Sequence, residues 1–236
     1  MNLTDFRELV SSLGLDDNAK IALLAGKVGL DDYQLVLVTS DGALVSEDNA
    51  GNGGWNDYTM AASSIPLAHS SAPALSLFRD GLYLPAFVGT GGNVKDAFVS
   101  IHIEHDYKPG TSLYPHVHWS HKVASPSGSV KWGIEYSVSK GHQLGVFPSS
   151  TTVYVTQAAG ATYTHHIVEV SDGDAIPSTN VEPDSVVLLR LFRDPTDGGD
   201  TFEDDAFLVA VDLHYRSTGL FTNEKVSPFT PHYGSF

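Results

Sequence analysis

The chain has 236 residues, no cysteine, and a formal net charge of −15 from 13 basic and 28 acidic residues. That charge disfavours nucleic acid as a partner, because phosphate backbones are bound by clustered Lys and Arg. The lack of cysteine excludes a disulfide framework and thiolate metal sites. No stretch approaches the roughly 18 apolar residues of a membrane span, and MNLTDFRELV lacks the features of a secretory signal. We therefore expect a soluble protein with no nucleic-acid or membrane partner.

The first 46 residues predict a small helical and hairpin unit. Apolar residues recur at helical spacing over residues 3–13, and a second helix is predicted from Asp16 or Asp17 through Val28. Residues 34–39 and 43–46 flank an Asp-Gly pair, which is typical of a two-residue β-hairpin turn. This unit is expected to anchor on the main domain or on a partner subunit. Residues 47–54, EDNAGNGG, predict a linker because they lack apolar anchors.

Strand-like segments separated by turn signals fill the rest of the chain up to residue 226. They are residues 82–88, 97–105, 114–123, 130–138, 151–157, 162–170, 185–193 and 206–215. No helical pattern of ten or more residues interrupts them. The fold class is therefore all-β, and residues 55–226 are predicted to form an eight-stranded antiparallel jelly roll or β-sandwich, with an up-and-down barrel as the alternative.

Three segments in the middle of the chain carry an unusual density of histidine. The alternation in residues 97–105 puts His102 and Glu104 on one face and the isoleucines on the other. In residues 114–123 it puts His116 and His118 opposite Trp119. Residues 130–138 bury Trp132 and expose Glu135 by the same period. If these strands are neighbours, both tryptophans share the core and the histidines and glutamates share one polar face.

The histidine spacing is compatible with a metal. The pattern matches the opening of the first cupin motif: Gly110, five residues, and then His116-Val117-His118. In that motif the two histidines present their imidazoles to one Zn, Fe or Mn ion. The glutamate that should follow is absent, and so is the second motif. His102 and Glu104 are candidates to complete such a site. The alternative is a metal-free face that meets water or another subunit, and it is the default expectation, with no cofactor.

Two further features are candidates for a site. The loop at residues 194–205 concentrates carboxylates around a glycine pair, as a calcium site requires, but it does not follow the EF-hand order and an acidic loop is commonly just solvated. Acid/base catalysis by Glu135 with Glu104, or a serine activated by His116 or His118, has no diagnostic spacing. We therefore expect no catalytic residues and no enzyme activity.

The C-terminal residues 227–236, SPFTPHYGSF, predict an extended arm. Pro228 and Pro231 restrict pairing in a sheet, and Phe229, Tyr233 and Phe236 need an apolar surface. A neighbouring copy could provide that surface, so these three aromatic residues are interface candidates in a homo-oligomer, with a trimer as the expected state.

Several sequence blocks occur in an order that resembles a known family. They are WND at residues 55–57, IEHDYKPG, YPHVHW, VKWGIEYSVSKGH, VEPD, LFRDPTDGGDTF and VDLHY. Over residues 55–217 the chain is similar to a family of virion structural proteins of tailed bacteriophages and prophages. The resemblance implies a part of a virion, assembled in the host cytoplasm and contacting the major capsid protein or tail proteins. It implies no catalytic residue.

Three functions follow from these features. The first is a capsid decoration or cement protein. The second is a tail-fibre, spike or head-fibre module that binds a host surface glycan. The third is a cupin-like metal-dependent enzyme.

Overall fold

The computed structural model describes residues 54–65 and 69–219, together with short strands at residues 24–27, 33–38, 44–45, 221–222 and 231–232. The described residues form strands, turns and short 3-10 segments, and they include no α-helix. None of the described segments is a helix with the length and hydropathy needed to cross a membrane.

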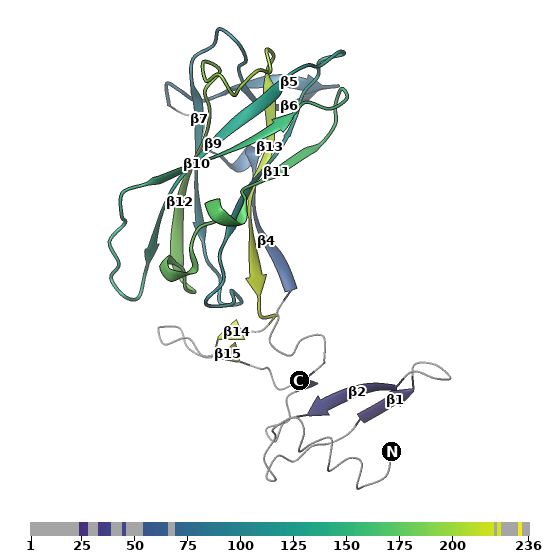
Figure 1. Cartoon of the computed structure of the whole chain (residues 1–236), viewed down its shortest axis with the longest axis vertical. Helices are drawn as coiled ribbons and strands as arrows, with labels where there is room; N and C mark the ends of the chain where they lie inside the picture. Colours follow the sequence, from purple (N-terminus) through teal and green to yellow (C-terminus); the bar gives the residue numbers. More distant parts are fainter. Residues whose placement is uncertain are drawn as a thin grey trace.

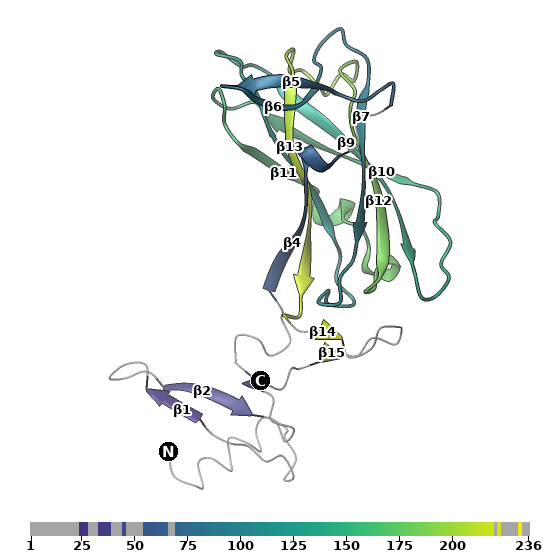
Figure 2. The same ribbon diagram turned by 180° about the vertical axis from the view of Figure 1, so that it is seen from behind.

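Ten of these strands form two antiparallel sheets that face each other (Figures 1 and 2). The four-stranded sheet has the order β10-β9-β12-β7. Its strands are β7 (Lys95–His102), β9 (Ser129–Lys140), β10 (Thr151–Ala158) and β12 (Ser185–Arg193). The six-stranded sheet has the order β11-β8-β13-β6-β5, with β4 also paired to β13. Its strands are β4 (Gly54–Ala61), β5 (Ala74–Arg79), β6 (Leu82–Phe87), β8 (Tyr114–Ser120), β11 (His166–Glu169) and β13 (Ala206–Ser217).

The eight strands from β6 through β13 pair in the pattern of a jelly roll. Strand β6 pairs with β13, β7 with β12, β8 with β11, and β9 with β10. These nested pairs are one long hairpin, and rolling it up brings β8 beside β13 and β9 beside β12. The eight predicted segments are these eight strands, so the predicted jelly-roll sandwich is confirmed.

Two strands of the sandwich, β4 and β5, were not predicted from the sequence. Strand β4 lies at the edge of the sheet and is exposed over most of its length, and β5 exposes leucines to solvent. Neither has the alternation of a half-buried strand, which is the signal that the sequence prediction used.

The prediction that residues 97–105, 114–123 and 130–138 are neighbouring strands is wrong. Strand β8 lies in the six-stranded sheet, whereas β7 and β9 lie in the other sheet with β12 between them. The reason is that successive strands of a rolled hairpin cross from one sheet to the other. Trp119 and Trp132 are nevertheless both fully buried, and their ring centroids lie 6.4 Å apart. They share the core by facing each other from opposite sheets.

The N-terminal strands β1 (Leu24–Lys27), β2 (Tyr33–Val38) and β3 (Leu44–Val45) form a small antiparallel sheet. The two predicted hairpin strands are confirmed, but Val38 pairs with Leu44, which does not fit a two-residue turn at residues 41–42. The helix predicted through Val28 is wrong at residues 24–27, which form an antiparallel strand paired with residues 33–36. The helix predicted at residues 3–13 and linker residues 47–53 lie outside the described residues.

The end of the chain also differs from the prediction. Strand β14 (Phe221–Thr222) pairs with β15 (Pro231–His232), so the arm pairs back onto the segment after β13. Pro231 is the first residue of its strand, where the missing N–H is tolerated. Phe229, Tyr233 and Phe236 lie outside the described residues.

Candidate functional site

The outer face of the six-stranded sheet carries a cluster of histidines and carboxylates that we call the histidine face. Its members are Asp57, His116, His118, Glu169, Asp212 and His214. The register of the sheet brings them together, because His116 lies between Glu169 on β11 and Asp212 on β13. Two residues further along β13, His214 lies opposite Asp57 on β4.

The ring nitrogens of this face point at the carboxylates. Nε2 of His116 lies 3.7 Å from Oδ2 of Asp212 and 3.9 Å from Oδ1 of Asp57. Nε2 of His118 lies 3.3 Å from the same oxygen of Asp212, and Nε2 of His214 lies 2.8 Å from Oδ1 of Asp57. The rings of His116 and His214 stack with their centroids 4.0 Å apart.

The centre of the face is shielded from water although it lies outside the core. The side chains of His116 and Asp212 are 2% and 7% exposed. Burial lowers the pKa of His116, and it also lowers the pKa of His118, against the opposing effect of Asp212. The hydroxyl of Thr59 donates a hydrogen bond to Oδ2 of Asp212 at 3.0 Å. Among the residues that the structure describes, two sets have ligand atoms within 4.8 Å of one another and could hold a metal: His116, His118 and Asp212, and Asp57, His116 and His214.

Only half of the predicted metal set is found here. His116 and His118 belong to the face, but His102 and Glu104 do not, because β7 lies in the other sheet. Their place is taken by Asp212, His214 and Asp57, which the sequence analysis missed. The alternation Asp212-Leu213-His214 repeats the spacing of His116-Val117-His118 and was the signal available.

His102 belongs instead to a second group, the Asp184 cluster. The carboxylate of Asp184 lies 3.0 Å from Nε2 of His102, 3.2 Å from Nε2 of His105 and 2.6 Å from Nε2 of His142. Burial raises the pKa of Asp184, but the hydrogen bond from His142 and the other two histidines outweigh it, so this pKa lies below its usual value. The cluster ties the end of β7 and the β9–β10 loop to the start of β12.

The acidic loop predicted as a calcium candidate is bonded within the chain. Asp200 accepts two hydrogen bonds from Arg193, both at 2.8 Å, and one from the backbone N–H of Lys131. Asp197 pairs with Nζ of Lys131 at 2.7 Å, and Asp194 accepts hydrogen bonds from Thr196. Asp197 and Asp200 therefore hold the β12–β13 loop onto the sandwich, and Asp194 closes a turn within the loop.

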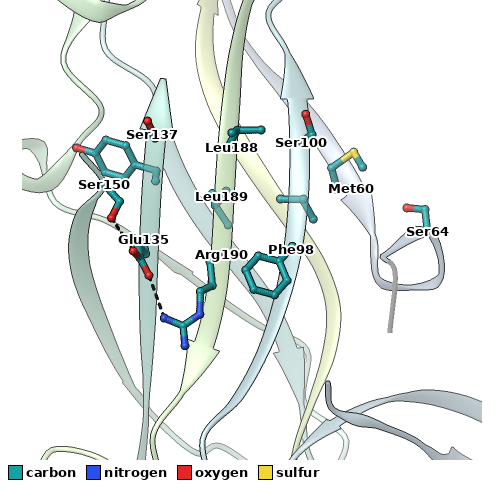
Figure 3. Close-up of a pocket in the computed structure, with 12 residues that line it drawn as sticks. Met60, Ser64, Phe98, Ser100, Glu135, Ser137, Ser150, Leu188, Leu189 and Arg190 are labelled. Atoms are coloured by element: carbon teal, nitrogen blue, oxygen red, sulfur yellow. Dashed lines mark hydrogen bonds and ion pairs between the residues drawn. The ribbon is translucent and has the colours of Figure 1, made fainter. Parts of the chain in front are cut away.

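A groove of about 480 Å³ runs across β9, β12 and β7 (Figure 3). Phe98 and Leu188 line it beside a polar pair in which Arg190 donates to Glu135 at 2.9 Å. The hydroxyl of Ser150 donates to Glu135 at 2.6 Å, and these two hydrogen bonds lower the pKa of the carboxyl. Glu135 is thus a carboxylate paired with Arg190 and Ser150.

The fold and its surfaces define the class of protein: a jelly-roll β-sandwich with a shielded histidine and carboxylate cluster on one face. No protein-family model and no curated protein matches the chain. Among solved structures, the chain is similar to the infectious bursal disease virus Gt strain structure, with 13% identity, 90% of this chain covered and a TM-score of 0.36. It is also similar to the infectious bursal disease virus VP2 subviral particle, with 12% identity, 88% of this chain covered and a TM-score of 0.32. The chain spans 40% and 42% of the lengths of those two chains. A third match is dimeric latent PorU from Porphyromonas gingivalis, with 14% identity, 74% of this chain and 15% of that chain covered, and a TM-score of 0.28.

Proposed function

We propose that this protein is a structural component of a bacteriophage virion, a capsid decoration or cement protein that acts as a homotrimer and catalyses no reaction. Its partners are further copies of itself and the major capsid protein. The observation that carries the proposal is a set of large apolar side chains that the sandwich leaves in water.

The most exposed of these side chains lie at the tip of the β9–β10 loop. Leu144 is 90% exposed and Val146 is 86% exposed, and Phe147 follows them. A second group lies on the β5–β6 hairpin at the sheet edge, where Leu75, Leu82 and Tyr83 are exposed. Exposed groups of large apolar side chains are typical of a contact site with another protein. A second copy of this chain is the occupant that a symmetric assembly provides.

The sequence blocks that carry the resemblance supply residues that stabilise the fold. The blocks IEHDYKPG, VKWGIEYSVSKGH and VEPD supply His105, His142 and Asp184, which meet in one cluster. The block LFRDPTDGGDTF supplies the buried pair of Arg193 and Asp200. These residues tie strands and loops together, so the blocks that carry the resemblance hold the sandwich in shape.

Sedimentation of the full-length protein tests the self-association. We expect a trimer at micromolar concentration, and a shift toward monomer in the double variant Leu144→Ser, Val146→Ser. Leu188→Ser, on the outer face of the four-stranded sheet, is the matched control and should stay trimeric. A monomeric wild-type protein would overturn the trimer.

Incorporation into particles tests the place of the protein in the virion. Labelling or cryo-electron microscopy of purified virions should locate it on the capsid surface. Removal of residues 1–50 and 227–236 should abolish incorporation while the sandwich stays folded. Full incorporation of that truncated chain would rule out anchoring through the two ends.

The groove on the four-stranded sheet favours a second candidate, a fibre module that binds a host glycan. Phe98 and the hydroxyl-bearing Ser100 and Ser137 line the same groove, and an aromatic ring together with hydrogen-bonding groups suits a sugar. Binding of host surface glycans that is lost in Phe98→Ala, with a location at the tail, would support this candidate over the first.

A further inference from the structure

We propose that the histidine face binds one divalent transition-metal ion through Nε2 of His116, Nε2 of His118 and the carboxylate of Asp212, and that the ion fastens β8 to β13. Nothing in the assembly role requires this ion, so the proposal goes beyond that role and can fail without it.

The hydrogen bonds around the two histidines leave Nε2 of each ring turned to Asp212. Nδ1 of His118 lies 2.8 Å from Nε2 of His165, and Nδ1 of His116 lies 3.5 Å from the carbonyl oxygen of Tyr114. A proton on Nδ1 satisfies both contacts and leaves a lone pair on Nε2. Fixing the ring through its other nitrogen is how metal-binding histidines are oriented.

His118 shows the consequence most clearly. Its Nε2 is buried and has no hydrogen-bond partner, although it lies 3.3 Å from Oδ2 of Asp212. A lone pair facing a carboxylate oxygen is repulsive unless a cation lies between them. A metal ion removes the repulsion and uses both atoms as ligands.

Asp212 provides a second, independent observation. Its side chain is 7% exposed, and Oδ1 is buried without a hydrogen-bond partner. Within the described part of the chain, its ion-pair partners are His116 and His118 and include no Lys or Arg. A carboxylate withdrawn from water needs a compensating positive charge.

The spacing and chemistry of the donors fit such an ion. The three ligand atoms lie within 4.8 Å of one another, and tetrahedral zinc with bonds of about 2.0–2.2 Å holds its donors about 3.3 Å apart. Small side-chain movements close that difference. Two imidazoles and a carboxylate without sulfur suit zinc, iron or manganese. His214 and Asp57 lie on the exposed side, where either one or a water molecule can complete the coordination.

Metal analysis and titration of the full-length protein test this proposal. Zinc is the first probe, followed by manganese and iron(II), each added to protein that has been stripped with a chelator. We expect one equivalent of at least one of these ions per chain and a rise in melting temperature with that ion. Cobalt(II) bound at the same site should show ligand-field absorption bands of nitrogen and oxygen ligands.

Two ligand variants and a matched control separate this site from adventitious binding. Asp212→Asn and His118→Gln should each weaken binding by at least about 100-fold, whereas His102→Gln, a histidine of the Asp184 cluster, should leave it unchanged. Without metal, Asp212→Asn should melt at or above the wild-type temperature, because the uncompensated charge is gone. If Asp212→Asn fails to fold, His118→Gln carries the test alone. Absence of saturable binding of all three ions, or equal affinity in the folded ligand variants, would overturn the proposal.

Discussion

Arg193 shows how a single side chain can hold a loop that the sequence presents as a cluster of acids. It is fully buried and uses all five of its N–H donors. Nε and one terminal nitrogen bind the two oxygens of Asp200, and the remaining bonds reach the carbonyl oxygens of Phe87, Phe202 and Asp204. One guanidinium thereby joins the end of β6, the end of β12 and the loop before β13.

Replacement of Arg193 should therefore be severe even when the charge is kept. Arg193→Lys cannot make the planar two-point contact with Asp200, and we expect a loss of about 3–5 kcal/mol in the free energy of unfolding. The control is Arg190→Lys, because Arg190 pairs with Asp96 and Glu135 but is partly exposed. We expect at most about 1 kcal/mol there. Urea denaturation measures both, and similar losses would contradict this view of the loop.

The two core tryptophans differ in one polar contact. Nε1 of Trp119 donates to Oε1 of Gln157 at 2.8 Å, whereas Nε1 of Trp132 is buried without a partner. Either tryptophan replaced by alanine should cost about 3–5 kcal/mol. Trp119→Phe should cost about 1 kcal/mol more than Trp132→Phe, because it alone breaks a hydrogen bond. Equal losses by thermal or urea unfolding would show that this bond contributes nothing net.

Among the structural elements, the β9–β10 loop and the start of β12 are coupled through Asp184. This residue has a φ of 64°, a left-handed conformation that aspartate tolerates better than most residues. The turn aims its carboxylate at His102, His105 and His142. The loop that carries the exposed Leu144 is thereby fixed at its base.

Asp184→Asn should weaken the fold in a pH-dependent way. The pKa of Asp184 is lowered in the folded state, so its contribution is present above the unfolded pKa of about 3.9 and is lost as the pH falls through the folded value. We expect a loss of about 1–2 kcal/mol at pH 7. The difference between variant and wild type should begin to shrink as the pH falls below about 4 and should vanish once the pH is below the lowered pKa of the folded state. A difference that persists at pH 2 would mean that the carboxylate charge is not its cause.

At the scale of the whole molecule, residues 54–219 contain all the strands of the β-sandwich. Every strand of the two large sheets and the whole described core lie in that range. The fragment 54–236 should therefore fold without the first 53 residues and show a β-type circular dichroism spectrum with a cooperative melt. A helical spectrum, or no cooperative transition, would contradict an independent β domain.

The sequence by itself determined which residues face inward. A period of two placed Val117, Trp119, Trp132 and Ile134 in the core and left His102 and Glu104 outside it, and the structure agrees. This was possible because successive side chains of a strand point to opposite faces, whatever strand lies next to it. The edge strand β4 was not predicted, because it has no buried face that would give its sequence a clear alternation.

Only the tertiary structure decided which strands are neighbours, and therefore which residues share a site. His116 and His118 were visible as a pair, but their partners Asp57 and Asp212 come from strands about 60 residues before and 95 residues after them. A face is a local property of one strand, whereas a site on a sheet is set by the pairing of strands distant in the chain. In a rolled hairpin that pairing follows from how the whole chain closes, which is why His102 was assigned to the wrong cluster.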